Sequence, residues 1–312
     1  MVTFSSLLES PTAYKAVLVT GCDMYAGYQI ALDVLQHKGK HFKCVYAVYF
    51  KENDMVHHLK KHGADCIKLA VADGADAIAK AYSKADVVVV LPPVSDDHWG
   101  KDSCVFVSAA EKAKIKGLVL CSKINADQLD NLPMLKPLIQ MEQAYHDIKG
   151  KIKVASLVRC SLHIDMLWLF RDQIASDGKI CLPTNGRAKF APLVESDASH
   201  ALCRMLIDPN IPAGTYQLTG PEQLDFETVA QHAASKLDEE ITFNEIERKD
   251  MEQFLKDKVK LCDNHIGYIG DMLEALSKGL LDKCTGDLEQ LLGKQPMSVK
   301  KYFEKNANDF KP

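Results

Sequence analysis

The sequence predicts an α/β protein with a doubly wound parallel sheet and a smaller, mainly helical subdomain toward its C-terminus. Three observations support this fold class. Short apolar runs alternate with helical patterns, as in chains whose parallel strands are joined by crossover helices. A buried strand at residues 16–19 runs through a glycine turn into a helix. Residues 86–91 are nearly all valine, which is typical of a strand covered on both faces.

The other elements follow in a regular order through the first half of the chain. Glycines at positions 39, 63 and 150 end three of the expected helices, and Pro92 and Pro93 end the valine strand. We expect strands at residues 43–49, 65–69, 117–121 and 154–158, and helices at residues 25–37, 56–62, 75–83, 105–113 and 133–149.

The second half of the chain is less regular. Residues 162–175 have a helical pattern, and residues 216–221 read as a strand that ends in a turn. Helices are expected over most of residues 227–310, with breaks near Gly267, Gly279 and Gly293. We therefore divide the chain into an N-terminal arm (1–13), a sheet domain (14–160, with return segments at about 190–220) and a cleft-forming subdomain (161–189 and 221–312).

Composition narrows the class of protein. The 312 residues are 47% hydrophobic and 26% charged, which is typical of a globular chain. A net charge of −4 gives no support for nucleic-acid binding, and no apolar run is long enough to span a membrane. The ten cysteines are scattered singly, and the N-terminus does not resemble a signal peptide. We expect a cytoplasmic protein with reduced thiols and no metal site.

The turn at residues 21–27 is built like a site for the pyrophosphate of a dinucleotide. In such a turn the first glycine allows a sharp bend, the middle one lets phosphate approach the backbone, and the last lets helix and strand pack closely. Gly21 and Gly27 take the outer places, but Met24 stands in the middle one and Asp23 adds a negative charge. The expected cofactor-binding residues are Thr20, Gly21, Asp23, Met24, Tyr25, Gly27, Lys51 and Pro92.

Two interpretations of this turn remain open. In one, Met24 and Asp23 weaken, reshape or abolish the dinucleotide site. In the other, Asp23 caps the following helix and Met24 simply packs. Lys51 follows the second strand, where a basic residue favours a 2′-phosphate, so NADP is the expected cofactor if a nucleotide binds at all.

Several stretches, in this order, resemble the NmrA-like family, an atypical branch of the short-chain dehydrogenase/reductase superfamily. They are the turn at 21–27, the strand with its two prolines at 86–93, the segments 135–142 and 157–159, the segment 192–198, the segment 218–226, and 292–296 with Phe303. The resemblance implies a Rossmann domain that binds NAD(P) and a small C-terminal domain that completes a cleft. It also implies either a reductase of small molecules or a regulator that contacts other proteins.

The resemblance also locates the superfamily's catalytic Ser…Tyr-x-x-x-Lys set. Ser122 follows the fifth strand, where such a serine belongs, with Lys123 beside it. In the family's register Met134 and Leu138 hold the tyrosine and lysine positions, so both appear apolar. Tyr145 fits the motif only as a string, because it lies at the far end of its helix. His163 is a further candidate for a general acid, although a structural histidine is the commoner case.

These observations favour a non-catalytic or weakly catalytic NAD(P)-binding regulator or redox sensor. A second hypothesis is an NADPH-dependent reductase of quinone- or carbonyl-type molecules. A third is a structural, self-assembling protein that has lost nucleotide binding. A protein partner at the C-terminal helices and a homo-oligomer are both compatible with the sequence.

Overall fold

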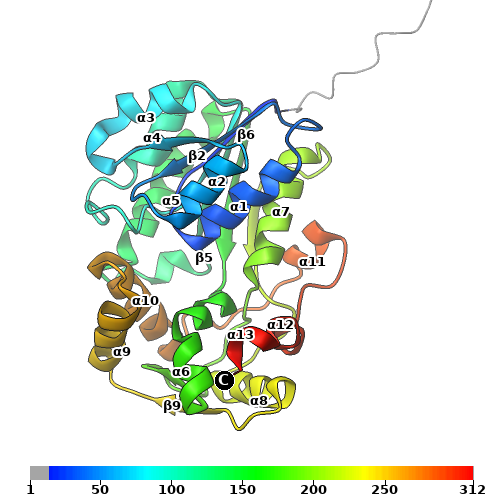
Figure 1. The fold of residues 1–312 in the computed structure, drawn as a ribbon. Coiled ribbons are helices and arrows are strands. Elements are labelled where there is room, and N and C mark those ends of the chain that lie inside the picture. The colour runs from blue at the N-terminus through cyan, green and yellow to red at the C-terminus, as the bar shows by residue number, and fades with distance from the viewer. Residues whose placement is uncertain (1–13, 312) are drawn as a thin grey trace, which may run out of the picture.

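The computed structural model describes residues 14–311, so the expected N-terminal arm at 1–13 lies outside the described residues. A sheet with helices on both faces fills one half of the molecule, and the C-terminal helices gather below it (Figure 1). The predicted fold class, an α/β protein with a doubly wound parallel sheet, is confirmed.

Within residues 14–311, seven parallel strands form the main sheet in the order β3-β2-β1-β4-β5-β6-β8. The order reverses between β1 and β4, and a crevice opens at such a point above the carboxyl ends of the strands. The strands are β1 (Ala16–Val19), β2 (Cys44–Tyr49), β3 (Asp65–Lys68), β4 (Val87–Val90), β5 (Gly117–Lys123), β6 (Val154–Cys160) and β8 (Thr215–Leu218).

Side chains of successive strand residues supply two separate cores. Leu18 packs on one face with Val88, while Val17 and Val19 pack on the other, because strand residues alternate between faces. One face carries α3 (Gly74–Tyr82), α4 (Val105–Ala113) and α5 (Lys136–Ile148), and the other carries α1 (Tyr25–Gln36), α2 (Asp54–Lys61) and α7 (Glu195–Ile207).

The C-terminal subdomain holds short elements that the sequence did not reveal. Strands β7 (Lys179–Leu182) and β9 (Thr242–Glu245) form a separate two-stranded parallel sheet. Each has four residues, too few for periodicity to distinguish a strand from a loop. In the expected return segments, isolated bridges join His163 to Leu193 and Phe190 to Leu224, and β8 pairs with β6 in the main sheet.

The helical part of the subdomain differs from expectation at two places. The expected helix at 162–175 is a 3-10 segment, η4 (Ile164–Phe170), followed by α6 (Arg171–Asp177). The break expected at Gly267 is wrong, because this residue lies inside α10 (Asp263–Ser277). A Cβ on Gly267 would lie 3.1 Å from the Met134 Cγ, so this glycine allows close packing.

The other helices are α8 (Phe226–Leu237), α9 (Arg248–Phe254), α11 (Asp287–Leu292), α12 (Val299–Lys305) and α13 (Ala307–Phe310), with a π-helical turn at η5 (Leu255–Val259) and 3-10 turns at η1 (Val71–Asp73), η2 (Ala126–Gln128) and η3 (Lys149–Lys151). All ten cysteines lie within residues 14–311 and are free thiols. Across the same residues no helix combines the length and the apolar character needed to cross a membrane.

Candidate functional site: a cavity at the carboxyl edge of the sheet

A cavity of about 600 Å³ lies above the carboxyl ends of β4, β5 and β6. The first turns of α1 and α7, the η4 segment and one side of α10 form its walls. Its lining is mostly apolar, with a few polar groups, as in many small-molecule sites. The lining residues used below are Met24, Tyr25, Met55, Pro92, Cys160, Ser122, Lys123, His163, Asp165, Met166, Trp168, Glu195, Tyr268 and Met272.

The outer glycines of the β1–α1 turn serve its backbone geometry. Gly21 has a φ of +69°, which a residue with a side chain rarely adopts. A Cβ on Gly27 would lie 2.2 Å from the Gly21 carbonyl oxygen, so only glycine lets α1 approach β1 this closely. The Thr20 hydroxyl accepts a hydrogen bond from the Leu91 N–H at 2.9 Å and thereby joins β1 to the end of β4.

Met24 occupies the place of the middle glycine and forms the N-cap of α1. Its Cε lies 3.3 Å from the position that a Cβ on Gly21 would take, so the thioether folds back over the glycine turn. The same side chain lines the cavity. Met24 therefore covers the backbone that a pyrophosphate would approach.

Asp23 joins the β1–α1 turn to two other loops. Its carboxylate accepts hydrogen bonds from the N–H groups of Phe50 and Lys51, both at 3.1 Å, and from the Ser95 hydroxyl at 2.6 Å. The expectation that Asp23 caps α1 is wrong, because no side chain caps this helix. The carboxylate is buried and points toward the end of β2 instead.

The loop between β4 and α4 also forms a hydrogen bond to the segment that follows β3. The Asp96 carboxylate is buried and accepts a hydrogen bond from the Val71 N–H at 3.0 Å, just after β3. Lys51 pairs with Asp97 at 2.7 Å, but both side chains are exposed, so this pair adds little stability. In dinucleotide-binding sheets the adenosine ribose lies above the end of β2. At that end of this sheet, the Phe50 and Lys51 N–H groups are bound to the Asp23 carboxylate.

A buried ion pair lies at the opposite end of the crevice. The His163 Nδ1 contacts the Glu195 carboxylate, whose side chain is almost fully buried. Burial alone lowers the pKa of His163, but the charge of Glu195 outweighs it and the pKa is raised to about 9. His163 is therefore an imidazolium at neutral pH, and it is neutralised by Glu195.

A second carboxylate lies beside this pair. Asp165 accepts a hydrogen bond from the Glu195 N–H at 2.8 Å at the start of α7. Burial raises the pKa of Asp165 to about 6. Burial and the charges of Asp165 and Glu195 raise the pKa of Tyr25, at the mouth of the cavity, to about 12. This side of the cavity is therefore the acidic one.

Ser122 and Lys123 lie at the end of β5 and also line the cavity. The Ser122 hydroxyl is buried and has no hydrogen-bond partner within residues 14–311. Lys123 is the register partner of Cys160 on β6 and forms no ion pair within the same range. Lys123 also opposes the burial that raises the pKa of Tyr268, which places its charge near α10.

Met134 and Leu138, which the resemblance places at the superfamily's tyrosine and lysine positions, do not line the cavity. Leu138 is fully buried in the core, and Met134 precedes α5 and packs against α10. Tyr145 is also buried in the core, and burial raises its pKa to about 12. None of the three lines the cavity.

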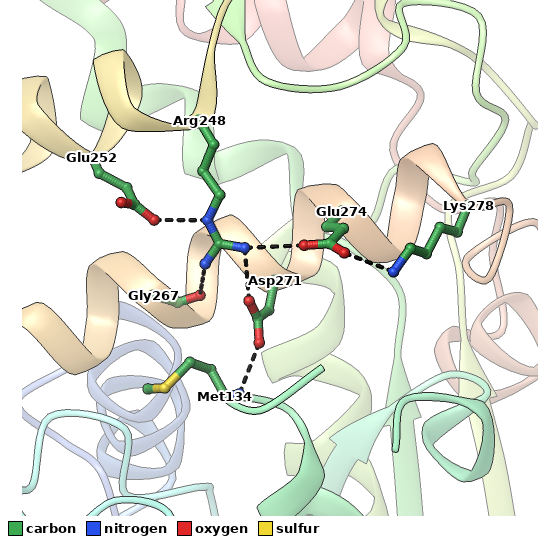
Figure 2. A network of polar contacts seen from close by, with 7 residues as sticks. All are labelled: Met134, Arg248, Glu252, Gly267, Asp271, Glu274 and Lys278. Atoms are coloured by element: carbon green, nitrogen blue, oxygen red, sulfur yellow. Dashed lines mark hydrogen bonds and ion pairs between the residues drawn. The ribbon is translucent and has the colours of Figure 1, made fainter. Parts of the chain in front are cut away.

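An ionic network holds the α10 wall in place (Figure 2). The Arg248 guanidinium donates to Glu252 at 2.7 Å, pairs with Asp271 at 2.9 Å and Glu274 at 3.1 Å, and donates to the Gly267 carbonyl at 3.4 Å. Asp271 in turn accepts from the Met134 N–H at 2.7 Å. The network fixes α10 to α9 and to the segment before α5.

The structure places the sequence-predicted residues in two groups. Six of them line the cavity, namely Met24, Tyr25, Pro92, Ser122, Lys123 and His163. Thr20, Gly21, Asp23, Gly27 and Lys51 lie in or beside the turn and do not line it. Sequence reasoning missed Glu195, Asp165 and the α10 wall. Glu195 lies within the expected return segments, and an acidic residue there was the available signal.

Comparison with known proteins supports the fold. No family model matches the chain. It is 20% identical over 231 residues to Prestalk A differentiation protein A of Dictyostelium discoideum, which covers 74% of this chain and 73% of that protein. Among solved structures, a Citrobacter sp. triphenylmethane reductase complexed with NADP(H) has a TM-score of 0.74 at 17% identity, covering 93% of this chain and 99% of that one.

Two further solved structures differ in the kind of protein that they represent. An Escherichia coli NADPH-dependent quinone oxidoreductase complexed with NADPH has a TM-score of 0.74 at 17% identity, covering 94% and 98% of the two chains. NmrA, a negative transcriptional regulator, has a TM-score of 0.71 at 12% identity, covering 93% and 95%. The same architecture thus occurs in reductases and in a regulator. The chain shares the fold of these structures, NmrA among them, and this confirms the fold that the sequence resemblance implied.

Proposed function

We propose that this protein is a ligand-binding regulator that uses only one half of the Rossmann crevice and does not transfer hydride. The observation that supports the proposal is that the Asp23 carboxylate accepts hydrogen bonds from the two N–H groups that follow β2. The open cavity lies above the ends of β4, β5 and β6, beside the first turn of α1. A regulator with this fold is also represented among the similar structures.

Admitting a dinucleotide requires breaking several contacts at once. Asp23 would lose its hydrogen bonds from two backbone N–H groups and from the Ser95 hydroxyl. Asp96 would lose its hydrogen bond from the Val71 N–H. Hydrogen bonds to charged groups contribute about 1.5–3 kcal/mol each, so the total opposes binding strongly. The phosphates would also approach two buried carboxylates of like charge.

The site also offers little of the superfamily's proton-transfer chemistry. Neither of the family's two catalytic positions carries a hydroxyl or an amine, because they hold Met134 and Leu138. His163 is already bound to Glu195 through one nitrogen, and its other nitrogen is buried. The cavity is therefore suited to binding and holding a molecule.

Calorimetric titration of the purified full-length protein with NADPH and with NADH tests the proposal. We expect no saturable binding below about 1 mM and no nucleotide oxidation with quinone or aldehyde substrates. Met24→Gly combined with Asp23→Thr should tighten NADPH binding by about tenfold or more. Met55→Ala, which shortens another cavity thioether and leaves the turn sequence unchanged, serves as the matched control. Micromolar NADPH binding by the unmodified protein would contradict the proposal.

The second candidate is an NADPH-dependent reductase of quinones or carbonyl compounds. It is favoured by one specific observation: the Lys123 ammonium and the Ser122 hydroxyl line the cavity where a substrate carbonyl would lie. Two of the similar structures are reductases complexed with NADPH or NADP(H). Steady NADPH oxidation that depends on Lys123 would favour this candidate over the regulator.

A further inference from the structure

The cavity is lined for a flat or branched apolar molecule. Four methionine side chains face it, from Met24, Met55, Met166 and Met272. Methionine adapts its shape to a ligand, and its sulfur makes favourable contacts with aromatic rings. Tyr25, Trp168 and Tyr268 add aromatic surface. A volume of about 600 Å³ is in the range of small-molecule sites.

One charge in this apolar cavity lacks a partner. Glu195 pairs with the His163 Nδ1, although the buried Nε2 has no hydrogen-bond partner within residues 14–311, and Asp165 accepts from the N–H at the start of α7. Lys123 has no ion pair within residues 14–311, and the neighbouring Ser122 hydroxyl has no hydrogen-bond acceptor. An unpaired cation and an orphan donor in a largely apolar site are costly unless a ligand supplies an acceptor.

The distribution of charge also limits the ligand's charge and its orientation. The charges of Asp165 and Glu195 act on the pKa of Tyr25, whereas the charge of Lys123 acts on the pKa values of Tyr268 and His163. An anionic group is repelled by the two carboxylates and attracted to the Lys123 end. A single ammonium matches a single negative charge, so a phosphate dianion fits less well than a carboxylate.

We propose that the cavity binds a hydrophobic monocarboxylic acid, aromatic or branched, whose carboxylate pairs with Lys123 and accepts a hydrogen bond from Ser122. The apolar body then lies among the methionines and the Trp168 ring. This inference rests on the proposed function, because it requires that no nicotinamide ring fills the same space.

The test compares two ligands of equal shape by isothermal titration calorimetry with the full-length protein. The probes are 1-naphthoate and the neutral 1-naphthalenemethanol. We expect the acid to bind at least tenfold more tightly than the alcohol. Lys123→Met should remove this preference and leave binding of the alcohol within about twofold. Lys84→Met, the same change at an exposed lysine, should leave both affinities unchanged.

Ser122→Ala gives a second measurement, with an expected three- to tenfold loss for the acid alone. Equal binding of acid and alcohol by the unmodified protein overturns the proposal, as does a preference that persists in Lys123→Met. Absence of binding by either probe overturns it too. A parallel NADPH titration separates the two ideas, since tight NADPH binding with an acid preference intact contradicts only the proposed function.

Discussion

The two ends of the crevice lie along one edge of the same sheet, yet their side chains are arranged in opposite ways. Above β2 and β3, the carboxylates of Asp23 and Asp96 satisfy the backbone N–H groups of the loops. Above β5 and β6, no group in the described part of the chain (residues 14–311) hydrogen-bonds to the Ser122 hydroxyl or forms an ion pair with the Lys123 ammonium. The comparison shows that the carboxyl edge of one sheet can carry polar groups that are bound to the protein at one end and polar groups that are free to bind a ligand at the other.

The largest expected effect tests whether the outer glycines serve packing without any cofactor. Gly27→Ala places a Cβ 2.2 Å from the Gly21 carbonyl oxygen, so α1 must move away from β1. We expect a loss of about 4 kcal/mol in the free energy of unfolding, or failure to fold. Gly150→Ala is the control, because nothing lies within 4 Å of a Cβ there. Chemical denaturation followed by circular dichroism measures both, and equal stability of the two variants would contradict the argument.

The next effect concerns α10, which forms one wall of the cavity. Arg248→Met leaves the buried Asp271 carboxylate with only the Met134 N–H, so stability should fall by about 3 kcal/mol. Arg187→Met removes an exposed pair with Glu227 and should cost less than about 0.5 kcal/mol. Urea titrations of both variants provide the comparison. A small effect at Arg248 would show that α10 is held by its apolar contacts alone.

Substitution of Asp23, at the end of the crevice above β2, should lower the stability less. Asp23→Asn replaces one acceptor oxygen by an NH₂ group that cannot accept from the Lys51 or Phe50 N–H. We expect a loss of about 2 kcal/mol in the free energy of unfolding. Asp97→Asn, at an exposed position, is the matched control. Hydrogen exchange at residues 50 and 51 should accelerate in the first variant only.

A separate effect, of the same order as those above, is a pH dependence that originates at the His163–Glu195 pair. The folded-state pKa of His163 is raised from 6.5 to about 9, so folding favours the protonated ring. Its contribution to stability is therefore complete below about pH 6.5 and is lost as the pH rises through about 9. Each unit of pKa shift corresponds to about 1.4 kcal/mol.

Unfolding titrations at pH 6.5 and pH 9 measure that loss. His163→Phe should flatten the difference between the two pH values, because the titrating ring is gone. Asp165 acts in a lower range: burial raises its pKa to about 6, so its contribution declines as the pH rises from about 4 to 6. An unchanged slope in His163→Phe would assign the pH dependence to another group.

The sheet could be predicted from the sequence because its signals are local. The valine strand, the glycine turn and the alternating elements can each be recognised from a few consecutive residues. The same reasoning identified Met24 as the unusual residue in the turn. It did not find that Asp23 reaches Phe50 and Ser95, because a side-chain contact between loops leaves no periodic trace.

Contacts between distant segments explain the rest of what was missed. Glu195 meets His163 only because the segment before α7 lies beside the end of β6. Helix α10 is far along the chain from the strands that it faces. Gly267 was predicted as a helix break because its neighbour Met134, against which it packs, is distant in the sequence. Pairing of β7 with β9 across residues 183–241 is equally invisible to local patterns.

That β7–β9 pairing also affects how the chain reaches its native state. The two strands cannot meet until α7, β8 and α8 have been made and placed, so the contact has a high sequence separation. Such contacts form slowly, because a long loop must be ordered before they contribute stability. Helix α10 follows β9 in the chain, and during synthesis the N-terminal part folds first. We therefore expect refolding to show an early phase for the sheet and a later one in which the methionine-lined cavity acquires its last wall.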